Sequence, residues 1–358
     1  MHLIIPMAGK SSRFPDLKPK WMLTHPSGNF MVLEAIAGLN LFDFEKIHFI
    51  YLKEHERIHN FLKGFKEEIE DMNIMSKVEF IELDEPTKDQ PHTVYEAIRL
   101  KNIKGPIFIK DSDNRFSYKY TGKNVICYED LNDVGLIKPK NKSYIQANSE
   151  GTVINIIEKQ VISSNFCVGG YGFESANQYT AAYDALDSLD ERYISNLIYH
   201  QILAEKVFMA EKVKAYSDWG TVEDWDRFKR SYATLFVDLD GTLVQNSSWH
   251  FPPYIGESEP LKNNVEIIKL LQQSGKFEII ITTSRPHKFR ETTEKQLQNL
   301  GIKYTYLLMN LNHSKRIIIN DYSKSNPYKS CDAINLKRNA DDLKEILRES
   351  LGIDYEEI

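Results

Sequence analysis

The chain opens with Leu3-Ile4-Ile5-Pro6-Met7-Ala8-Gly9-Lys10-Ser11-Ser12-Arg13-Phe14, an apolar run that leads into a loop of small and hydroxyl-bearing residues. The apolar run has the composition of a β-strand. Gly9, Ser11 and Ser12 allow backbone N–H groups to approach a phosphate closely, and Arg13 adds a guanidinium that can bind phosphate oxygens. The sequence therefore predicts a strand followed by a phosphate-binding loop.

Beyond this loop, apolar runs typical of strands alternate with amphipathic stretches typical of helices. The predicted strands cover residues 3–7, 46–52, 77–83 and 106–110. The predicted helices cover residues 30–41, 54–70 and 93–100. This alternation predicts an α/β domain with a mostly parallel, doubly wound sheet, in which ligands bind beyond the carboxyl ends of the strands.

Between residues 124 and 173 the pattern changes to strand-like runs separated by polar turns. These runs cover residues 124–128, 134–138, 143–147, 152–158 and 167–173. They predict a mixed or antiparallel addition to the sheet, and a helix at 176–204 and a strand at 207–215 follow. We therefore expect residues 1–230 to form one Rossmann-like domain with a mixed sheet.

A second α/β alternation follows, with a boundary expected in residues 229–233. Its predicted strands cover residues 234–238, 277–282, 303–308 and 316–320, and its predicted helices cover residues 261–273, 287–300 and 340–351. Residues 233–358 are thus predicted to be a second, compact, doubly wound domain. The linker is short and not rich in Gly or Ser, so we expect the two domains to be held close together.

The composition excludes several classes of protein. A length of 358 residues suits two domains. The net charge of -6 and the lack of a basic block argue against a nucleic-acid partner. No apolar run approaches the roughly 20 residues of a membrane helix, and no signal peptide is evident, so we expect a cytoplasmic protein. The three cysteines have neither zinc-ligand spacing nor the pattern of a disulfide framework.

Lys18-Pro19-Lys20 follows the first loop, and Lys20 is placed to reach a phosphate. Together with the loop that ends in Arg13, this segment resembles the opening motif of the sugar nucleotidyltransferases, a GT-A-like family, over about residues 1–228. The resemblance implies transfer of a nucleoside monophosphate from a nucleoside triphosphate to a sugar or polyol phosphate. It implies nucleotide binding by Ala8, Gly9, Ser11 and Ser12, and catalytic roles for Arg13 and Lys20.

Two later segments resemble the metal-binding motifs of that family. Asp111-Ser112-Asp113-Asn114-Arg115-Phe116 is similar to a Gly-Asp-Asn-x-Phe segment, which implies that Asp113 is a magnesium ligand, with Asp111 as the alternative. Tyr216-Ser217-Asp218-Trp219-Gly220-Thr221 is similar to a Trp-x-Asp-x-Gly-Thr segment, which implies that Asp218 is the second ligand. Two carboxylates with phosphate oxygens make a suitable Mg²⁺ site.

Two further segments concern the substrates. Residues 87–94 stand where the family has small residues near the base and ribose, but this chain has Asp89 and Pro91 there, and Gln90 or Thr93 is the predicted base contact. Residues Glu158, Lys159 and Gly170 resemble the acceptor-sugar region. The alternative for Glu158 and Lys159 is an exposed ion pair at a strand end.

The second domain begins with Phe236-Val237-Asp238-Leu239-Asp240-Gly241-Thr242-Leu243. A carboxylate at a strand end can attack phosphorus, and an acid two residues later can protonate the leaving oxygen. The segment resembles the haloacid dehalogenase phosphatase superfamily over about residues 234–358. The resemblance implies that Asp238 is the nucleophile and Asp240 the acid and base, both beside Mg²⁺.

Other parts of that superfamily's site have counterparts later in the chain. Thr283, or else Thr282, is predicted to hold a phosphoryl oxygen, and Lys315, or else Arg316, to steady the phosphate. Asp321 is predicted to complete the metal site, although Asn320 stands where a second acid is usual. The gaps between these segments are too short for a cap domain, so we expect a capless phosphatase.

The sequence therefore predicts a bifunctional enzyme, similar to fusions of bacterial capsular polysaccharide biosynthesis. Its substrates would be a nucleoside triphosphate, with CTP favoured by the resemblance, and a sugar or polyol phosphate. Two alternatives stay open. In one, only one domain is catalytic and the other is a scaffold; in the other, the protein is a non-catalytic regulator that binds nucleotide sugars. The sequence also leaves a homo-oligomer open.

Overall fold

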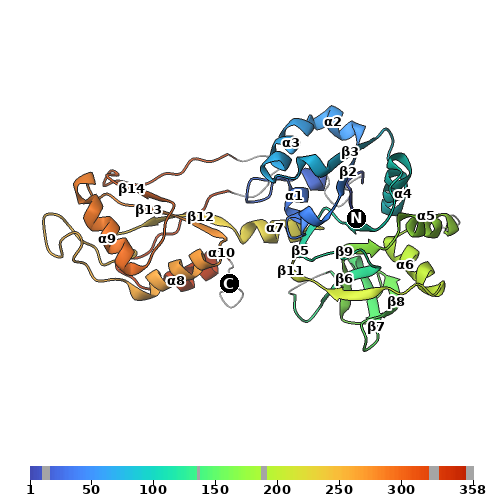
Figure 1. The fold of residues 1–358 in the computed structure, drawn as a ribbon. Coiled ribbons are helices and arrows are strands. Elements are labelled where there is room, and N and C mark those ends of the chain that lie inside the picture. The colour runs from blue at the N-terminus through green and yellow to red at the C-terminus, as the bar shows by residue number, and fades with distance from the viewer. Residues whose placement is uncertain (10–16, 135–137, 187–191, 322–329, 352–358) are drawn as a thin grey trace. The chain divides into compact units, whose positions relative to one another are not determined.

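The computed structural model describes residues 1–9, 17–134, 138–186, 192–321 and 330–351 (Figure 1). The chain divides into two compact units, Met1–Trp225 and Asp226–Ile358. This division falls inside helix α7 (Val222–Arg230), a helix that the sequence pattern did not predict.

Unit 1 is built on a nine-stranded mixed sheet. Strand β1 (His2–Pro6) lies between β2 (Lys46–Leu52) and β4 (Ile107–Lys110), and β3 (Val78–Leu83) pairs with β2. All three pairings are parallel. The predicted parallel half of the sheet is confirmed, and the carboxyl ends of these strands lie along one edge.

The other half of the sheet is mainly antiparallel, as predicted. Strand β9 (Asn165–Phe173) runs antiparallel to β4 and to β6 (Val125–Asp130). Strands β7 (Ser143–Ala147) and β8 (Val153–Glu158) form an antiparallel pair that joins β9 through β7. Strand β10 (Met209–Lys212) extends the edge in parallel with β6. The strand predicted at 134–138 falls partly outside the described residues.

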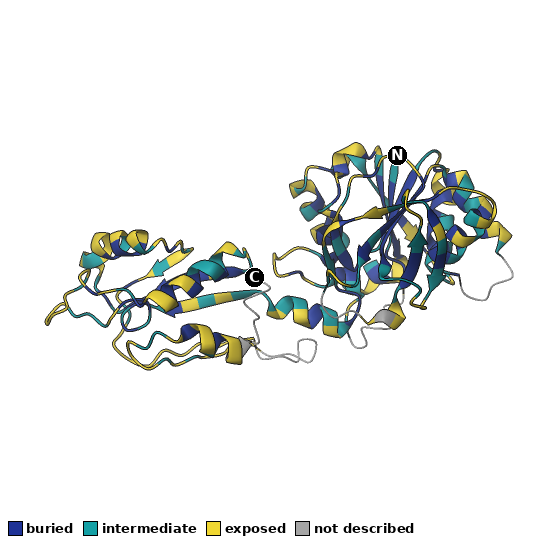
Figure 2. Ribbon diagram, turned by 90° about the horizontal axis from the view of Figure 1, so that it is seen from below, coloured by how far each residue is buried: buried dark blue, intermediate teal, exposed yellow. Residues whose placement is uncertain are grey.

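Helices cover both faces of this sheet, because successive strand residues point to opposite faces and are apolar on each of them. Leu3 and Ile5 of β1 belong to one apolar core, and Ile4 belongs to a second core on the opposite face. Figure 2 shows the strands as the buried centre of this unit. The first core contains residues of α1 (Met31–Ile36) and α3 (Leu62–Asp71). The second contains residues of α4 (Gln90–Lys101), α5 (Ala176–Ala185) and α6 (Ile194–Leu203).

Three predicted elements are each divided in the structure. The helix predicted at 54–70 is two helices, α2 (Lys53–His59) and α3, because Asn60 adopts a left-handed conformation with φ of 45° that ends α2. The helix predicted at 176–204 is α5 and α6. The strand predicted at 207–215 is β10 and β11 (Lys214–Asp218). Strand β11 pairs with β5 (Asn114–Ser117), which was not predicted.

Unit 2 contains a parallel three-stranded sheet in the order β12-β13-β14. The strands are β12 (Ala233–Asp238), β13 (Phe277–Thr282) and β14 (Tyr306–Leu308), and the helices are α8 (Lys262–Gln273), α9 (Arg290–Leu300) and α10 (Leu343–Leu351). Residues 239–261, all of them described, contain no helix or strand.

The strand predicted at 316–320 is wrong. These residues form no strand, and the side chains of Ile317, Ile318 and Ile319 are exposed by 74%, 53% and 92%. A run of β-branched residues favours a strand only where a neighbouring strand and an apolar face receive it. Neither is available to this run in the structure.

None of the helices in the described part of the chain has both the length and the apolar character that crossing a membrane requires. Cys127 and Cys167 are buried as free thiols, and Cys331 is an exposed free thiol.

Gly38 provides a test of the packing in unit 1. A Cβ atom at Gly38 would lie 2.0 Å from the carbonyl oxygen of Phe116 in β5, so we expect Gly38→Ala to lower the free energy of unfolding by about 1–3 kcal/mol. Gly64 is the matched control. It lies in α3 with nothing within 4 Å of its added Cβ, so Gly64→Ala should raise stability by about 0.5–1 kcal/mol. Denaturant unfolding followed by tryptophan fluorescence measures both, and equal effects would contradict this packing.

Candidate functional site

The candidate site of unit 1 is assembled by the short sheet of β5 and β11. Asp113 directly precedes β5, and Asp218 is the last residue of β11. In the antiparallel register Asp218 lies opposite Asn114, and the backbone N–H of Trp219 donates to the carbonyl oxygen of Asp113 at 2.9 Å. Folding therefore brings the two predicted metal ligands to neighbouring positions.

A lysine ammonium contacts each of these carboxylates. Lys20 pairs with Asp113, and Lys142 Nζ lies 2.5 Å from Oδ2 of Asp218. Lys142 also donates to the hydroxyl of Tyr216 at 3.0 Å. Burial lowers the pKa of Lys142, but Tyr216 and Asp218 outweigh burial and leave that pKa raised, so the ammonium stays charged.

Lys20 is predicted from its motif, whereas Lys142 is not predicted from the sequence. Lys142 stands directly before β7, where a lysine looks like part of an ordinary solvated surface. Only the pairing of β11 with β5 brings Asp218 to a place where this lysine can reach it. No motif in the sequence signals that contact.

Lys110, at the end of β4, holds the turn that presents the aspartates. Its side chain is completely buried, and its ammonium donates to the carbonyl oxygens of Asp111 and Asn114 at 2.8 and 2.9 Å and to Oδ1 of Asn114 at 2.7 Å. Burial lowers its pKa to about 8, while Asp111, Asp113 and Asp218 act in the opposite direction. This lysine fixes the backbone between β4 and β5.

Asp111, the alternative to Asp113, is bound from two sides. Gln90 Nε2 donates to Asp111 Oδ1 at 2.5 Å, and the Asp111 N–H donates to the carbonyl oxygen of Gly169 at 2.8 Å. A Cβ at Gly169, whose φ is +75°, would lie 2.3 Å from Oδ2 of Asp111. Burial, and then the charge of Asp113, raise the pKa of Asp111. The side chain of Gln90 thus points toward Asp111, which together with Asp113 and Asp218 we call the acidic cluster.

The predicted nucleotide loop is described only at its start. Ala8 is buried and Gly9 exposed, just past the carboxyl end of β1, while Ser11, Ser12 and Arg13 lie outside the described residues. Thr93 is buried, and its hydroxyl lies 2.6 Å from that of Thr87. The described contact of Thr93 therefore stabilises the segment that leads into α4.

The predicted acceptor residues have structural contacts of their own. Oε2 of Glu158 accepts hydrogen bonds from Ser143 and, at 2.8 Å, from Ser195, while Lys159 Nζ donates to the hydroxyl of Tyr193 at 2.6 Å. Gly170 pairs with Lys110 across β4 and β9, and a Cβ there would lie 2.6 Å from the ring of Phe116. Close packing therefore accounts for the glycine at position 170.

Two carboxylates of unit 1 are of the kind that can hold a magnesium ion. Nowhere in the described residues do three or more His, Cys, Asp or Glu side chains gather as a metal-binding group. Mg²⁺, however, is commonly held by one or two carboxylates with water and substrate phosphates. Asp113 and Asp218 supply two carboxylates from neighbouring strand ends, and both already attract a cationic side chain.

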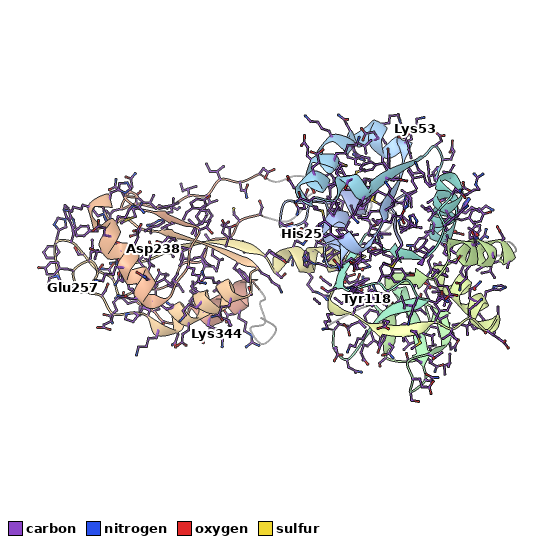
Figure 3. All side chains as sticks on the ribbon, in the orientation of Figure 1. His25, Lys53, Tyr118, Asp238, Glu257 and Lys344 are labelled. Atoms are coloured by element: carbon purple, nitrogen blue, oxygen red, sulfur yellow. The ribbon has the colours of Figure 1, made fainter. Side chains whose placement is uncertain are left out.

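In unit 2, Asp238 is the last residue of β12 (Figure 3). Burial raises the pKa of its carboxyl group, against the effect of Arg316, whose Nη2 donates to Oδ1 of Asp238 at 3.1 Å. Lys315 and Asp321 are exposed. The structure thus places Arg316, the alternative to Lys315, beside the predicted nucleophile. In the described hydrogen bonds of Asp321, its backbone N–H donates to Oδ1 of Asn320, and its carbonyl oxygen accepts from the hydroxyl of Ser330.

Asp240 is bound through both carboxylate oxygens. Arg285 donates to Oδ2 through Nε and to Oδ1 through Nη2, both at 2.8 Å. Ser247 donates to Oδ1 at 2.6 Å, and Thr283 to Oδ2 at 3.3 Å. A carboxylate has about four acceptor positions, so four donors occupy Asp240 fully. Thr283, predicted to hold phosphate, is buried beside it, and the buried hydroxyl of Thr282 donates to the carbonyl oxygen of Val237 at 3.4 Å.

Comparison with solved structures identifies the fold of unit 1. A nucleoside-diphosphate-sugar pyrophosphorylase from Vibrio cholerae RC9 superposes with a TM-score of 0.53 at 20% identity, covering 63% of this chain and 98% of that one. A UDP-glucose pyrophosphorylase complexed with UDP-glucose gives 0.51 at 16% identity, covering 63% and 96%. The inositol-1-phosphate CTP transferase of T. maritima gives 0.50 at 11% identity, covering 62% and 90%.

These likenesses show that the N-terminal 63% of the chain has the fold of those enzymes. The expected mixed α/β architecture of the N-terminal domain is thereby confirmed. No protein-family profile matches the chain, and no curated protein matches its sequence.

Lys110 generates a prediction about pH. Its folded pKa of about 8 lies below the ordinary value of 10.5, so the unfolded chain binds more protons between these two pH values. The free energy of unfolding of the wild type should therefore rise relative to that of Lys110→Met as pH increases from 8 to 10.5, by up to about 3 kcal/mol. Urea unfolding at several pH values measures the difference, and parallel curves would show that the prediction is wrong.

Arg285 generates a prediction about unit 2. Its side chain is 2% exposed and that of Asp240 18%, so Arg285→Met leaves a largely buried carboxylate without its cation and should cost about 3–5 kcal/mol. The pair of Arg316 with Asp238 is the control, because its side chains are 46% and 39% exposed, and Arg316→Met should cost less than about 1 kcal/mol.

The double variant Asp240→Leu/Arg285→Met removes both charges and should unfold at higher denaturant than Arg285→Met alone. Denaturant unfolding followed by Trp249 fluorescence reports on this unit. Equal costs for Arg285→Met and Arg316→Met would contradict the assignment of Asp240 and Arg285 as a buried pair.

Proposed function

We propose that unit 1 is a sugar-phosphate nucleotidyltransferase. The observation that carries the proposal is the convergence of Asp113 and Asp218 beside Lys20 and Lys142, past the carboxyl ends of the sheet strands. The proteins that share the fold are named as pyrophosphorylases of nucleotide sugars and as a CTP transferase. A paired set of carboxylates and ammoniums is suited to a reaction between two phosphorylated molecules.

The proposed reaction needs positioning and charge rather than a base. Asp113 and Asp218 would hold Mg²⁺, which offsets the charge of the triphosphate. Lys20 would bind phosphate oxygens near the α-phosphorus. An oxygen of the acceptor's phosphate, already ionised at neutral pH, attacks the α-phosphorus of the nucleoside triphosphate, and the bond to the β-phosphate oxygen breaks. The products are a nucleoside diphosphate sugar and pyrophosphate.

The proposed substrates are CTP and a sugar or polyol phosphate. The related folds include enzymes named for CTP and for UDP-glucose, so the fold itself does not select a base. The preference for CTP and a place in capsular polysaccharide synthesis in the cytoplasm are supported by the sequence resemblance. Gln90 donates to Asp111, two residues before the proposed metal ligand Asp113. Its side chain would therefore lie near a nucleotide bound at that metal ion.

For unit 2 we propose a phosphomonoester hydrolase of the haloacid dehalogenase type. Asp238, Asp240 and Asp321 would hold Mg²⁺ only after their side chains rearrange, because no three such ligands gather in the described residues. In this proposal Asp238 attacks phosphorus, the alcohol leaves with a proton from Asp240, and water then hydrolyses the aspartyl phosphate. The half-buried position of Asp238 at a strand end beside Arg316 supports the proposal.

A scaffold role for unit 2 is the second candidate. The occupation of both Asp240 oxygens by Arg285, Ser247 and Thr283 favours it, because an acid in those contacts has no oxygen left for a leaving group. Phosphatase activity would require this carboxyl to exchange at least one donor for the substrate.

The decisive assay combines four nucleoside triphosphates with a panel of sugar and polyol phosphates and follows pyrophosphate release. We expect one combination to react, and Asp113→Asn and Asp218→Asn each to slow it about 100-fold or more. Lys212→Met, which removes an exposed lysine of the same unit, should leave the rate unchanged. Absence of pyrophosphate release with every combination would refute the proposal for unit 1.

A separate assay follows phosphate release from the same sugar phosphates without nucleotide. Phosphatase activity that Asp238→Asn abolishes, while pyrophosphate release persists, supports two catalytic centres. If the wild type releases no phosphate from any of them while pyrophosphate release is intact, unit 2 is a scaffold.

A further inference from the structure

Lys142 holds a position that the proposed reaction does not yet use. Its ammonium lies 2.5 Å from Oδ2 of Asp218 and 3.0 Å from the Tyr216 hydroxyl. The side chain of Lys142 is 17% exposed and that of Asp218 is 14% exposed. The pair is therefore largely removed from water, in contrast to an ordinary surface ion pair.

The ammonium and a divalent metal ion would compete for Asp218. Oδ2 already accepts from Lys142, and Oδ1 accepts from the backbone N–H of Gly220 at 3.1 Å. Mg²⁺ binds carboxylate oxygens at about 2.0–2.1 Å. Two cations so close to one carboxylate repel each other strongly where water is largely excluded. Metal binding at Asp218 thus requires Lys142 to move away from Oδ2.

A displaced Lys142 needs a new partner, because a buried ammonium without an anion is unfavourable. The hydroxyl of Tyr216 offers only a neutral dipole. A phosphate group offers negative charge and several acceptor oxygens. The partner group is expected to come with the substrate, since both proposed substrates carry phosphate. The contact of Lys20 with Asp113 repeats the arrangement on the second carboxylate.

We propose that Lys142 is a resident counter-ion of Asp218 that exchanges for Mg²⁺ only when a phosphate-bearing substrate arrives to receive its ammonium. The inference rests on the proposed function of unit 1 and assigns Lys142 as a positioning residue. It makes metal binding and substrate binding cooperative. By linkage, each ligand increases the affinity for the other by the same factor.

The test measures the affinity of the full-length protein for Mn²⁺ by electron paramagnetic resonance. The titration is made with the protein alone, with CTP and with glucose 1-phosphate, after correction for Mn²⁺ that the added compound chelates in solution. The variants are Lys142→Met, Lys142→Arg and the control Lys212→Met. Lys212 pairs with Glu129 at 3.4 Å and also with Asp133, but it is 46% exposed.

In the wild type we expect weak binding of Mn²⁺ alone and binding about tenfold or more tighter with substrate. Lys142→Met should bind Mn²⁺ alone about tenfold more tightly than the wild type and lose most of the cooperativity. Lys142→Arg and Lys212→Met should behave like the wild type. If Lys142→Met abolishes the cooperativity of Mn²⁺ with only one of the two compounds, that compound carries the phosphate that receives the Lys142 ammonium. A purely structural lysine would not raise metal affinity when removed.

The inference is overturned if Lys142→Met binds Mn²⁺ alone no more tightly than the wild type, or if its cooperativity with both compounds is unchanged. Lys142→Gln, which keeps a polar group near Tyr216, provides the same comparison if the methionine variant does not fold. Pyrophosphate release by the wild type is measured separately. Activity without metal–substrate cooperativity refutes the exchange alone, whereas cooperativity without any pyrophosphate release refutes the proposed function.

Discussion

The pairing of β11 with β5 is the contact on which the candidate site of unit 1 depends. Asp113 and Asp218 come from distant parts of the sequence, and only this short antiparallel pair places them at neighbouring positions. Lys110 stabilises the turn that leads into β5, because its buried ammonium donates to the carbonyl oxygens of Asp111 and Asn114. A change that frees the β4–β5 turn would therefore affect the acidic cluster before it affected the rest of the sheet.

Electrostatic balance explains the composition around this cluster. Asp113 lies next to Asp218 across the β5–β11 pair, and its charge acts on Asp111. Like charges in a partly buried place require cations or protons. The lysines at positions 20, 110 and 142 supply the cations, while burial, and then the charge of Asp113, still raise the pKa of Asp111. In the proposed reaction, a metal ion would replace the lysines beside the aspartates, and phosphates would receive the lysine ammoniums. Unit 2 pairs charges differently, with Arg285 fully engaging Asp240.

Much of the architecture could be predicted from local patterns. The apolar run 46–52 is strand β2 to the residue, and the βα alternation predicted a parallel sheet with two covered faces. Asp113 and Asp218 could be selected by their motifs. Lys142 could not, because its role follows from the β5–β11 pairing and not from its neighbours in sequence. The strand expected at 316–320 failed for the same reason, since strand formation depends on a partner that the local sequence does not specify.

The central claim is that Asp113 and Asp218 together hold one divalent ion with a phosphorylated nucleotide. A crystal of the full-length protein grown with CTP and Mn²⁺ tests it through the anomalous signal of the metal. The account predicts a peak about 2.1 Å from a carboxylate oxygen of each aspartate, with nucleotide phosphate oxygens completing the coordination. A metal bound elsewhere on unit 1, or bound by only one of the two aspartates with Lys142 still on Asp218, would contradict it.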